Sequence, residues 1–346
     1  MRARGQRVLR IGGLSLLWRP RAMLVCGLLI AFGLLLGLFL LASGTTRLTP
    51  AGALAGLTGQ AETDVINRLV LRIRLPRLLT AAMVGAALGM SGAVFQSISR
   101  NALGSPDVIG FTTGAASGAI AQIILFNAGP VQTALAAVAS GVMTALVVLW
   151  LARGRKGGRE GGGGYRLILV GIGMGALMSG LNTLLMVMGD LERAMSAQIW
   201  LAGSLAARDW THVATAFAGL VVFAPLVLWN ARRLLVMSMG DDLARQLGLD
   251  PGRTRLVLVL ASVGLASVAT ACTGPIAFVA LAGPQLARWL TRSPDVPVVS
   301  GAIAGALLLL SADLVSQNAP FGLAMPIGLT TGLLGGLYLI LVSRRL

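Results

Sequence analysis

Long uncharged apolar runs, separated by short polar segments, set the pattern of this chain. A helix needs about 20 mainly apolar residues to cross the hydrocarbon core of a membrane. The runs do not alternate apolar and polar residues, as the strands of a membrane barrel would, so they predict helices. Ten membrane-spanning helices are predicted, over residues 22–43, 77–99, 107–125, 130–152, 165–188, 211–229, 254–271, 274–290, 296–316 and 325–343.

The composition supports this assignment. The chain is 56% hydrophobic and 12% charged, with a mean hydropathy of +0.83, whereas a soluble domain carries about 25% charged residues. The 46 glycines suit the close helix–helix approach that is common in lipid. The expected fold class is an all-α membrane protein, a polytopic bundle of ten transmembrane helices forming a single domain over residues 22–346.

The basic residues predict the orientation. If both termini are cytoplasmic, the cytoplasmic segments hold 21 of the 28 Lys and Arg residues, as the positive-inside rule requires. Residues 1–21 then form a basic cytoplasmic N-terminus. The apolar run that follows is too long for a signal-peptide core, so it is expected to be a retained first helix. Tryptophans fall near helix ends, as interfacial residues do, at Trp18, Trp150, Trp210, Trp229 and Trp289.

The net charge of +16 does not indicate a nucleic-acid partner. The basic residues are divided among many short loops and form no continuous stripe. Anionic lipid headgroups and membrane topology account for them better, so the lipid bilayer is the expected partner of this charge.

The chain lacks the residues of an enzyme or a metal site. Cys26 and Cys272 are expected at opposite faces of the membrane, and His212 is the only histidine, so three or four His and Cys ligands cannot be assembled. There is no Walker-type phosphate loop and no convincing catalytic triad. No catalytic residue, metal or bound cofactor is therefore expected in this chain.

Asp313 is the one acid expected inside the membrane, near the outer end of the ninth predicted helix. Such an acid is a functional candidate, although a bond to a neighbouring helix end or backbone is the favoured reading. A carrier driven by protons or sodium should bury several ionisable groups in the membrane, whereas this sequence offers only Asp313. The energy source for any transport is therefore expected on another subunit.

Two polar segments stand out. The longest outer loop, 44–76, ends with Arg68, Arg72 and Arg74, and Arg77 opens the next helix. These arginines oppose the positive-inside trend. They are either interface anchors or a docking patch for an acidic partner, because the planar guanidinium pairs with carboxylates through two hydrogen bonds.

The second segment is the longest inner connection, residues 230–253. Gly240 or Asp241 can cap a short helix and Gly248 can end it, which puts Leu243 and Leu247 on one face. A helix this short must rest on the membrane or on a partner protein, and the partner is the favoured reading.

The fifth predicted helix carries Met174, Met178 and Asn182 on one face, four residues apart. These side chains could line an adaptable passage, or they could pack within the bundle. The amphipathic stretch 191–206 that follows is too short to cross and is expected along the outer interface.

Several motifs resemble one family of membrane proteins. They are Arg74-Leu-Pro-Arg77, Ser91-Gly-Ala-Val-Phe-Gln96, Arg100-Asn-Ala-Leu-Gly-Ser-Pro-Asp-Val-Ile-Gly110, Gly274-Pro-Ile-Ala-Phe-Val-Ala-Leu281 and Pro326-Ile-Gly-Leu-Thr-Thr-Gly332. In this order they resemble the permease subunits of ATP-binding-cassette (ABC) importers for iron–siderophores and cobalamin. The resemblance covers roughly residues 40 to 345, and its Gly-Ser-Pro-Asp-Val wording is most similar to the ferric enterobactin permeases.

The resemblance implies a type II ABC importer permease with ten helices and several partners. A second permease subunit, either a relative or a second copy, would complete the passage, with a heterodimer favoured. Two ATPase subunits would hold ATP and magnesium, and a periplasmic or lipoprotein siderophore-binding protein would dock outside. The expected localisation is the bacterial cytoplasmic (inner) membrane.

The resemblance also implies residue roles. Arg74 and Arg77 would receive glutamates of the binding protein, and Met174, Met178 and Asn182 would line the passage. A coupling segment, 238–250, would seat on the ATPase through Gly240, Asp241, Asp242, Leu243, Ala244, Arg245, Leu247 and Gly248.

Three positions depart from the family pattern. Gln285 stands where the family often has histidine in Pro-His-Ile-Ala-Arg, Ala102 replaces the proline of Asn-Pro-Leu, and Gln317 occupies the neighbourhood of a third docking arginine. The Gln317 difference weakens one expected docking contact and fits pairing with a different permease subunit.

The sequence therefore predicts a non-enzymatic transport subunit that moves a ferric siderophore of the catecholate type into the cytoplasm. Cobalamin or haem remains an alternative cargo within the same family. An ion-coupled secondary carrier and an intramembrane enzyme are the alternatives outside it.

Overall fold

Helices make up nearly all of the computed structural model, which describes residues 7–11, 14–18, 20–44, 46–152, 163–292, 296–318 and 325–343. A short antiparallel hairpin precedes them, β1 (Arg7–Ile11) paired with β2 (Leu14–Trp18). Near the N-terminus follow α1 (Pro20–Ala42), α2 (Pro50–Leu57), α3 (Asp64–Leu69), the π-helical segment η1 (Val70–Arg74) and α4 (Leu75–Ser99).

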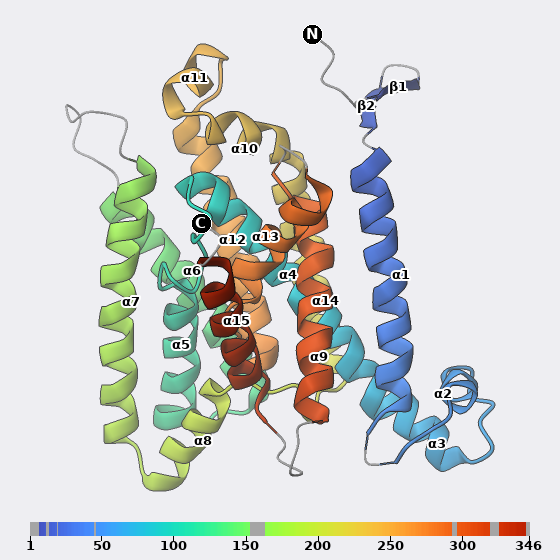
Figure 1. Ribbon diagram of the computed structural model, residues 1–346. Coiled ribbons are helices and arrows are strands. Elements are labelled where there is room, and N and C mark those ends of the chain that lie inside the picture. The colour runs from blue at the N-terminus through green and yellow to red at the C-terminus, as the bar shows by residue number, and fades with distance from the viewer. Residues whose placement is uncertain are drawn as a thin grey trace.

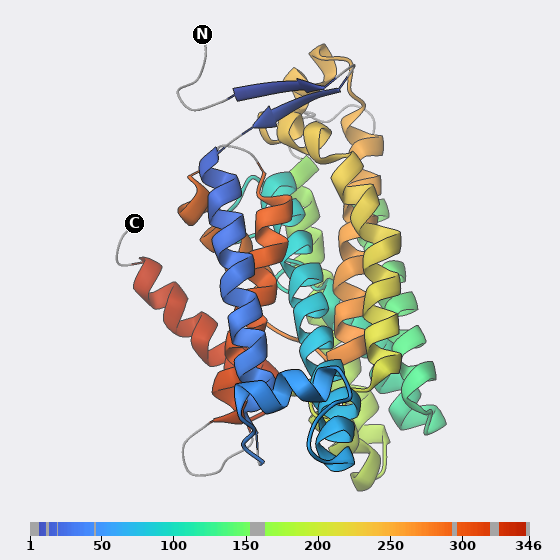
Figure 2. The same ribbon diagram turned by 90° about the vertical axis from the view of Figure 1, so that its right-hand side faces the viewer.

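The remaining helices form the rest of the bundle. They are α5 (Phe111–Phe126), α6 (Pro130–Ala152), α7 (Gly163–Met188), α8 (Leu191–Leu201), α9 (Trp210–Trp229), α10 (Ala231–Ser238), α11 (Asp241–Gln246), α12 (Pro251–Thr273), α13 (Val279–Thr291), α14 (Val298–Gln317) and α15 (Ile327–Ser343). The hairpin, α10 and α11 lie at one end of the bundle, and α2, α3 and α8 lie at the other (Figures 1 and 2). We call these the α11 end and the α8 end.

Two helices form the centre of the bundle. We compare the buried share of residues in the most apolar stretch of each helix. This share is 78% for α12 and 72% for the α3–α4 element, against 17% for α7 and 22% for both α1 and α9. The other helices surround this pair, and α15 tilts away from the rest (Figure 2). Because α1, α7 and α9 leave most of their apolar surface uncovered, lipid or another subunit must cover it.

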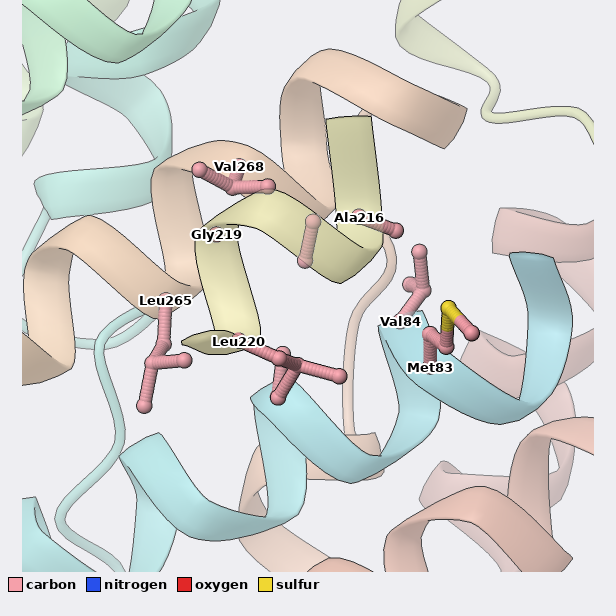
Figure 3. Close-up of a pocket in the computed structure, with 9 residues that line it drawn as sticks. Met83, Val84, Ala216, Gly219, Leu220, Leu265 and Val268 are labelled. Carbon is pink, nitrogen blue, oxygen red and sulfur yellow. The ribbon is translucent and has the colours of Figure 1, made fainter. Parts of the chain in front are cut away.

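Small residues let the central helices approach closely. A Cβ atom on Gly85 of α4 would lie 2.5 Å from the carbonyl oxygen of Gly305 on α14, so no larger residue fits there. Between α4, α9 and α12, Met83, Leu220 and Leu265 close around an apolar gap with no room for a water molecule (Figure 3). Packing of this kind supplies the contacts that hold apolar helices together in lipid.

Seven helices of the described chain are long and apolar enough to cross a membrane, and they cover seven of the ten predicted spans. The other three predicted spans hold shorter helices: α5 has 16 residues, α13 has 13 and α15 has 17. The backbone around residue 274 explains the shortness of α13, because Gly274 and Phe278 both take positive φ angles and delay the helix to Val279. The prediction of ten full-length helices is therefore confirmed only in part.

One further prediction needs correction. The loop expected over residues 44–76 contains α2, α3 and η1, and α3 continues through η1 into α4 as one bent element. The segment predicted to be a basic cytoplasmic N-terminus contains the β1–β2 hairpin, and its location stays a prediction. The short helix expected near residue 241 is present as α11, and the amphipathic stretch is present as α8.

Candidate functional sites at the two ends of the bundle

A buried carboxylate fixes α11 to the bundle. The side chain of Asp241 is only 5% exposed and accepts two hydrogen bonds of 2.9 Å from Nη2 of Arg255 on α12. It also accepts one of 3.2 Å from Nη2 of Arg100, the residue that ends α4. Charge-assisted bonds of this kind are stronger than neutral ones. The single carboxylate of Asp241 therefore joins α11 to both central helices.

The local backbone allows Asp241 to turn inward. Gly240, which precedes it, has a φ angle of +130°, and Gly248 beyond the helix has +79°. Gly240 is the N-cap of α11, whereas Asp241 makes no capping hydrogen bond. Of the two candidate caps in the sequence, Gly240 is confirmed and Asp241 is wrong, because its carboxylate is used by the two arginines instead.

The opposite face of α11 points outward. Leu243 is 39% exposed and Leu247 is 60% exposed, while Ala244 is fully buried against the bundle. Asp242 and Arg245 form an exposed ion pair of 2.9 Å on the same helix. The residues of the predicted ATPase-coupling segment thus form two groups. Asp241 and Ala244 face inward and anchor α11, whereas Leu243 and Leu247 form its outward apolar surface.

At the α8 end, Arg74 holds the end of α1. Its Nη1 donates to the carbonyl of Leu41 at 2.6 Å, and its Nη2 donates to that of Thr46 at 2.5 Å. The last carbonyls of a helix lack partners within the helix, so an arginine there satisfies them. Arg74 therefore already binds backbone carbonyls at the end of α1 within this chain.

Arg77 pairs with the intramembrane acid. Its Nη2 lies 2.6 Å from Oδ1 of Asp313, and its Nε donates to both carboxylate oxygens at 3.2 Å. The Asp313 side chain is 2% exposed and that of Arg77 is 27% exposed. Asp313 thus bonds a neighbouring helix, one of the two readings that its sequence position allowed. In contrast, Arg68 and Arg72 in the preceding turns are exposed.

The three departures from the family pattern all make contacts. Nε2 of Gln317 donates to Oδ2 of Asp313 at 2.8 Å, so the Asp313 carboxylate has Gln317 as a second partner beside Arg77. Nε2 of Gln285 donates to the carbonyl of Ala102 at 2.7 Å, and its Oε1 accepts from the Tyr338 hydroxyl at 3.1 Å. Two of the departures, Gln285 and Ala102, therefore contact each other.

The three residues predicted to line a passage lie on the packed side of α7. Asn182 is buried, and Met174 and Met178 are half-buried. The backbone carbonyl of Met178 lies 3.5 Å from Oγ of Ser117 on α5. The uncovered side of α7 carries other residues, and a Cβ atom added at Gly173 or Gly180 would meet open space. The passage role of the first three stays a prediction, and their packing supports the alternative that they hold α7 to α5.

The lone histidine has a structural role as well. His212 and Asp209 form a capping box at the start of α9, with 2.7 Å between Nδ1 and Oδ1. This hydrogen bond lowers the pKa of Asp209. Among the described residues, no group of three His, Cys, Asp or Glu side chains could hold a metal ion.

Sequence reasoning missed Asp107, in the connection between α4 and α5. Its Oδ2 is buried and has no hydrogen-bond partner among the described residues. Burial raises the pKa of this carboxyl to about 6, and a hydrogen bond with Thr112 lowers it only in part. Oδ2 of Asp107 and the carboxylate of Asp241 are both buried, but only Asp241 has arginine partners among the described residues.

A multi-pass bundle of long apolar helices, with ion pairs at its two ends, is the architecture of an integral membrane protein. The sequence matches the FecCD transport family over residues 29–345. The chain belongs to this family.

Comparisons with individual proteins support the assignment to this family. The chain is 39% identical over 322 residues to the ferric enterobactin transport system permease protein FepG of Escherichia coli, covering 93% of this chain and 96% of FepG. It is 32% identical over 328 residues to the hemin transport system permease protein HmuU of Yersinia pestis, covering 92% and 96%. A solved inward-facing metal-chelate type ABC transporter superposes with a TM-score of 0.81 at 26% identity, covering 94% of this chain and all of that one.

The Arg77–Asp313 pair should behave as a unit. Replacing Arg77 alone by Gln leaves Asp313 buried without its cation, which we expect to cost about 3 kcal/mol of stability. The double variant Arg77→Gln with Asp313→Asn should recover most of this loss. Thermal unfolding of the four proteins of the cycle in detergent measures the coupling. Additive losses in the double variant would contradict the pairing.

Asp241 and Asp107 should respond in opposite ways to loss of charge. Asp241→Asn removes the partner of two arginines, so we expect a loss of about 3 kcal/mol. Asp107→Asn removes a carboxylate whose raised pKa means that the stability contributed by its neutral form is lost as the pH rises from 3.8 to about 6. At pH 8 it should not lower the melting temperature. Equal destabilisation by both substitutions would contradict the difference in environment.

Proposed function

We propose that this chain is the permease subunit of an ABC importer that moves a ferric siderophore of the catecholate, enterobactin type across the bacterial inner membrane. The observation that carries the proposal is α11, a short helix beyond the bundle that is ion-paired to α4 and α12 and exposes Leu243 and Leu247. A separate ATPase can push on such a helix and move both central helices through Asp241.

The topology follows from the same assignment. We infer ten crossings, with the shorter α5, α13 and α15 completing the set and with both termini at the cytoplasmic α11 end. The α8 end is then periplasmic and receives the binding protein. The predicted excess of basic residues on the α11 side supports this orientation.

A second permease subunit completes the passage in this proposal. The uncovered face of α7 supports it, because Leu169, Leu184 and Val187 are 55–77% exposed and Gly173 has open space beside it. A related subunit or a second copy of this chain would cover that face. ATP and magnesium belong to the ATPase subunits, and this chain binds no cofactor.

The cargo assignment rests on similarity to FepG, and the similarity to HmuU keeps haem as the second candidate. A secondary carrier finds less support. Asp313, the one buried carboxylate in a spanning helix of the described chain, is engaged by Arg77 and Gln317. Binding of a transported proton would have to displace both.

Replacing the outward leucines should separate hydrolysis from transport. In the assembled transporter, Leu243→Asp with Leu247→Asp should lower siderophore uptake at least tenfold, while the ATPase retains basal hydrolysis. The matched control is Leu191→Asp, because Leu191 is 78% exposed at the opposite end. Uptake in vesicles and phosphate release are measured on the same preparation. Full uptake by the double variant would contradict the coupling role of α11.

The outer arginines fall into two pairs that differ in their contacts, so the binding role of each pair can be tested separately. Arg68→Glu with Arg72→Glu reverses two exposed charges, whereas Arg74→Glu with Arg77→Glu also breaks bonds within the chain. If Arg74 and Arg77 receive the binding protein, the second pair should weaken its binding at least tenfold, and the first pair should have a smaller effect. Surface plasmon resonance on transporter in lipid nanodiscs measures this. Unchanged binding by the second pair would reject the docking role of Arg74 and Arg77.

A further inference from the structure

A polar groove lies beside α11, where α9 passes into α10 and α12 begins. Its volume is about 220 Å³, and its lining includes Asn230, Arg233, Asp250, Arg253 and Val257. In Figure 2, the yellow α9 stands near the right-hand edge of the bundle with α10 above it. The groove therefore sits at the level where spanning helices meet the polar α11 end.

The groove carries net positive charge. The carboxylate of Asp250 caps α12 by accepting from the backbone N–H groups of Gly252 and Arg253 at 2.9 and 3.1 Å. Its other oxygen lies 3.4 Å from Nε of Arg253. The backbone N–H groups at the start of α12 thus already offset the one acid of the groove, and the long contact leaves the exposed Arg253 side chain available to a ligand.

Arg233 remains uncompensated by a carboxylate within the described chain. Its Nη1 donates to Oδ1 of Asn230 at 3.1 Å, which orients the guanidinium without neutralising it. Arg232 beside it is exposed and adds a further positive charge at the rim. A planar guanidinium held by a neutral amide is suited to bind a phosphate oxygen through its remaining N–H groups.

Helix spacing places exposed apolar residues of α9, here called the apolar track, in the turns that precede the groove. Leu226 and Val222 precede Asn230 by four and eight residues on α9, share its face, and are 44% and 58% exposed. Val257 on α12 is 38% exposed at the groove itself. Trp229, 84% exposed, has the exposure and position of an interfacial anchor.

We propose that this groove binds the phosphate headgroup of an anionic phospholipid, with Arg233 and Arg253 as the phosphate ligands and with an acyl chain along Leu226 and Val222. A soluble phosphate would use the arginines but not the apolar track. The track therefore favours the lipid. Basic pockets between helices at the cytoplasmic face are a known form of anionic lipid site.

The groove also includes Gly248 and Leu249, which follow α11 directly. A bound headgroup would restrict this turn and so stabilise one position of α11. This consequence rests on the proposed coupling function, whereas lipid binding itself does not.

Native mass spectrometry of the detergent-purified protein tests the proposal, with phosphatidylglycerol and phosphatidylcholine as probes. We expect the wild-type chain to retain one phosphatidylglycerol in preference to phosphatidylcholine. Arg233→Gln with Arg253→Gln should weaken this binding about thirtyfold, since each basic residue near an anionic surface contributes roughly a fivefold factor. The matched control, Arg68→Gln with Arg72→Gln, removes two exposed arginines at the opposite end and should leave the binding unchanged.

Four results would overturn the proposal. One is equal retention of the two lipids by the wild-type chain, a comparison that needs no variant. Another is displacement of the lipid by millimolar inorganic phosphate, which would assign the groove to a free anion. The third is an unchanged lipid count in the groove variant with weaker ATPase binding, which would make the groove a protein contact. Equal loss in groove and control variants would likewise reject the specific site.

Discussion

Helix α4 carries an ion pair at each of its ends, and the arrangement of the bundle depends on it. At the α8 end Arg77 binds Asp313 of α14, and at the α11 end Arg100 binds Asp241 beside Arg255 of α12. Between these ends α4 carries no charged residue and packs against small residues of its neighbours. A rigid helix joined at both ends can transmit displacement from one side of a membrane to the other without any charge in the middle.

Lipid explains why the polar chemistry is placed this way. A carboxylate in hydrocarbon is costly unless it is paired, so the acids among the described residues lie at the ends or are matched by arginine. Association of the apolar stretches cannot rely on the hydrophobic effect, so it depends on close contact through glycine and other small residues. The result is a bundle whose centre is packed and whose ion pairs lie towards its ends.

Much of the bundle could be predicted from the sequence, because long apolar runs determine which segments enter lipid. The α11 helix was also predictable, since two glycines bracket a six-residue helix. Tertiary contacts were not. Hydropathy does not show that Arg77 faces Asp313, residues 236 apart in sequence, or that Arg74 holds the end of α1. The four-residue spacing of Met174, Met178 and Asn182 identified a helix face correctly, but spacing alone cannot distinguish a face that packs on α5 from one that borders a passage.

The central claim is that this chain is a conduit whose energy comes from attached ATPases through α11. The most direct measurement is uptake of labelled ferric enterobactin into vesicles that contain the complete transporter and its binding protein. The account predicts accumulation that requires ATP, persists in the presence of an ionophore, and is lost when the ATPase subunits are omitted. Accumulation without ATP that collapses with the ionophore would contradict it.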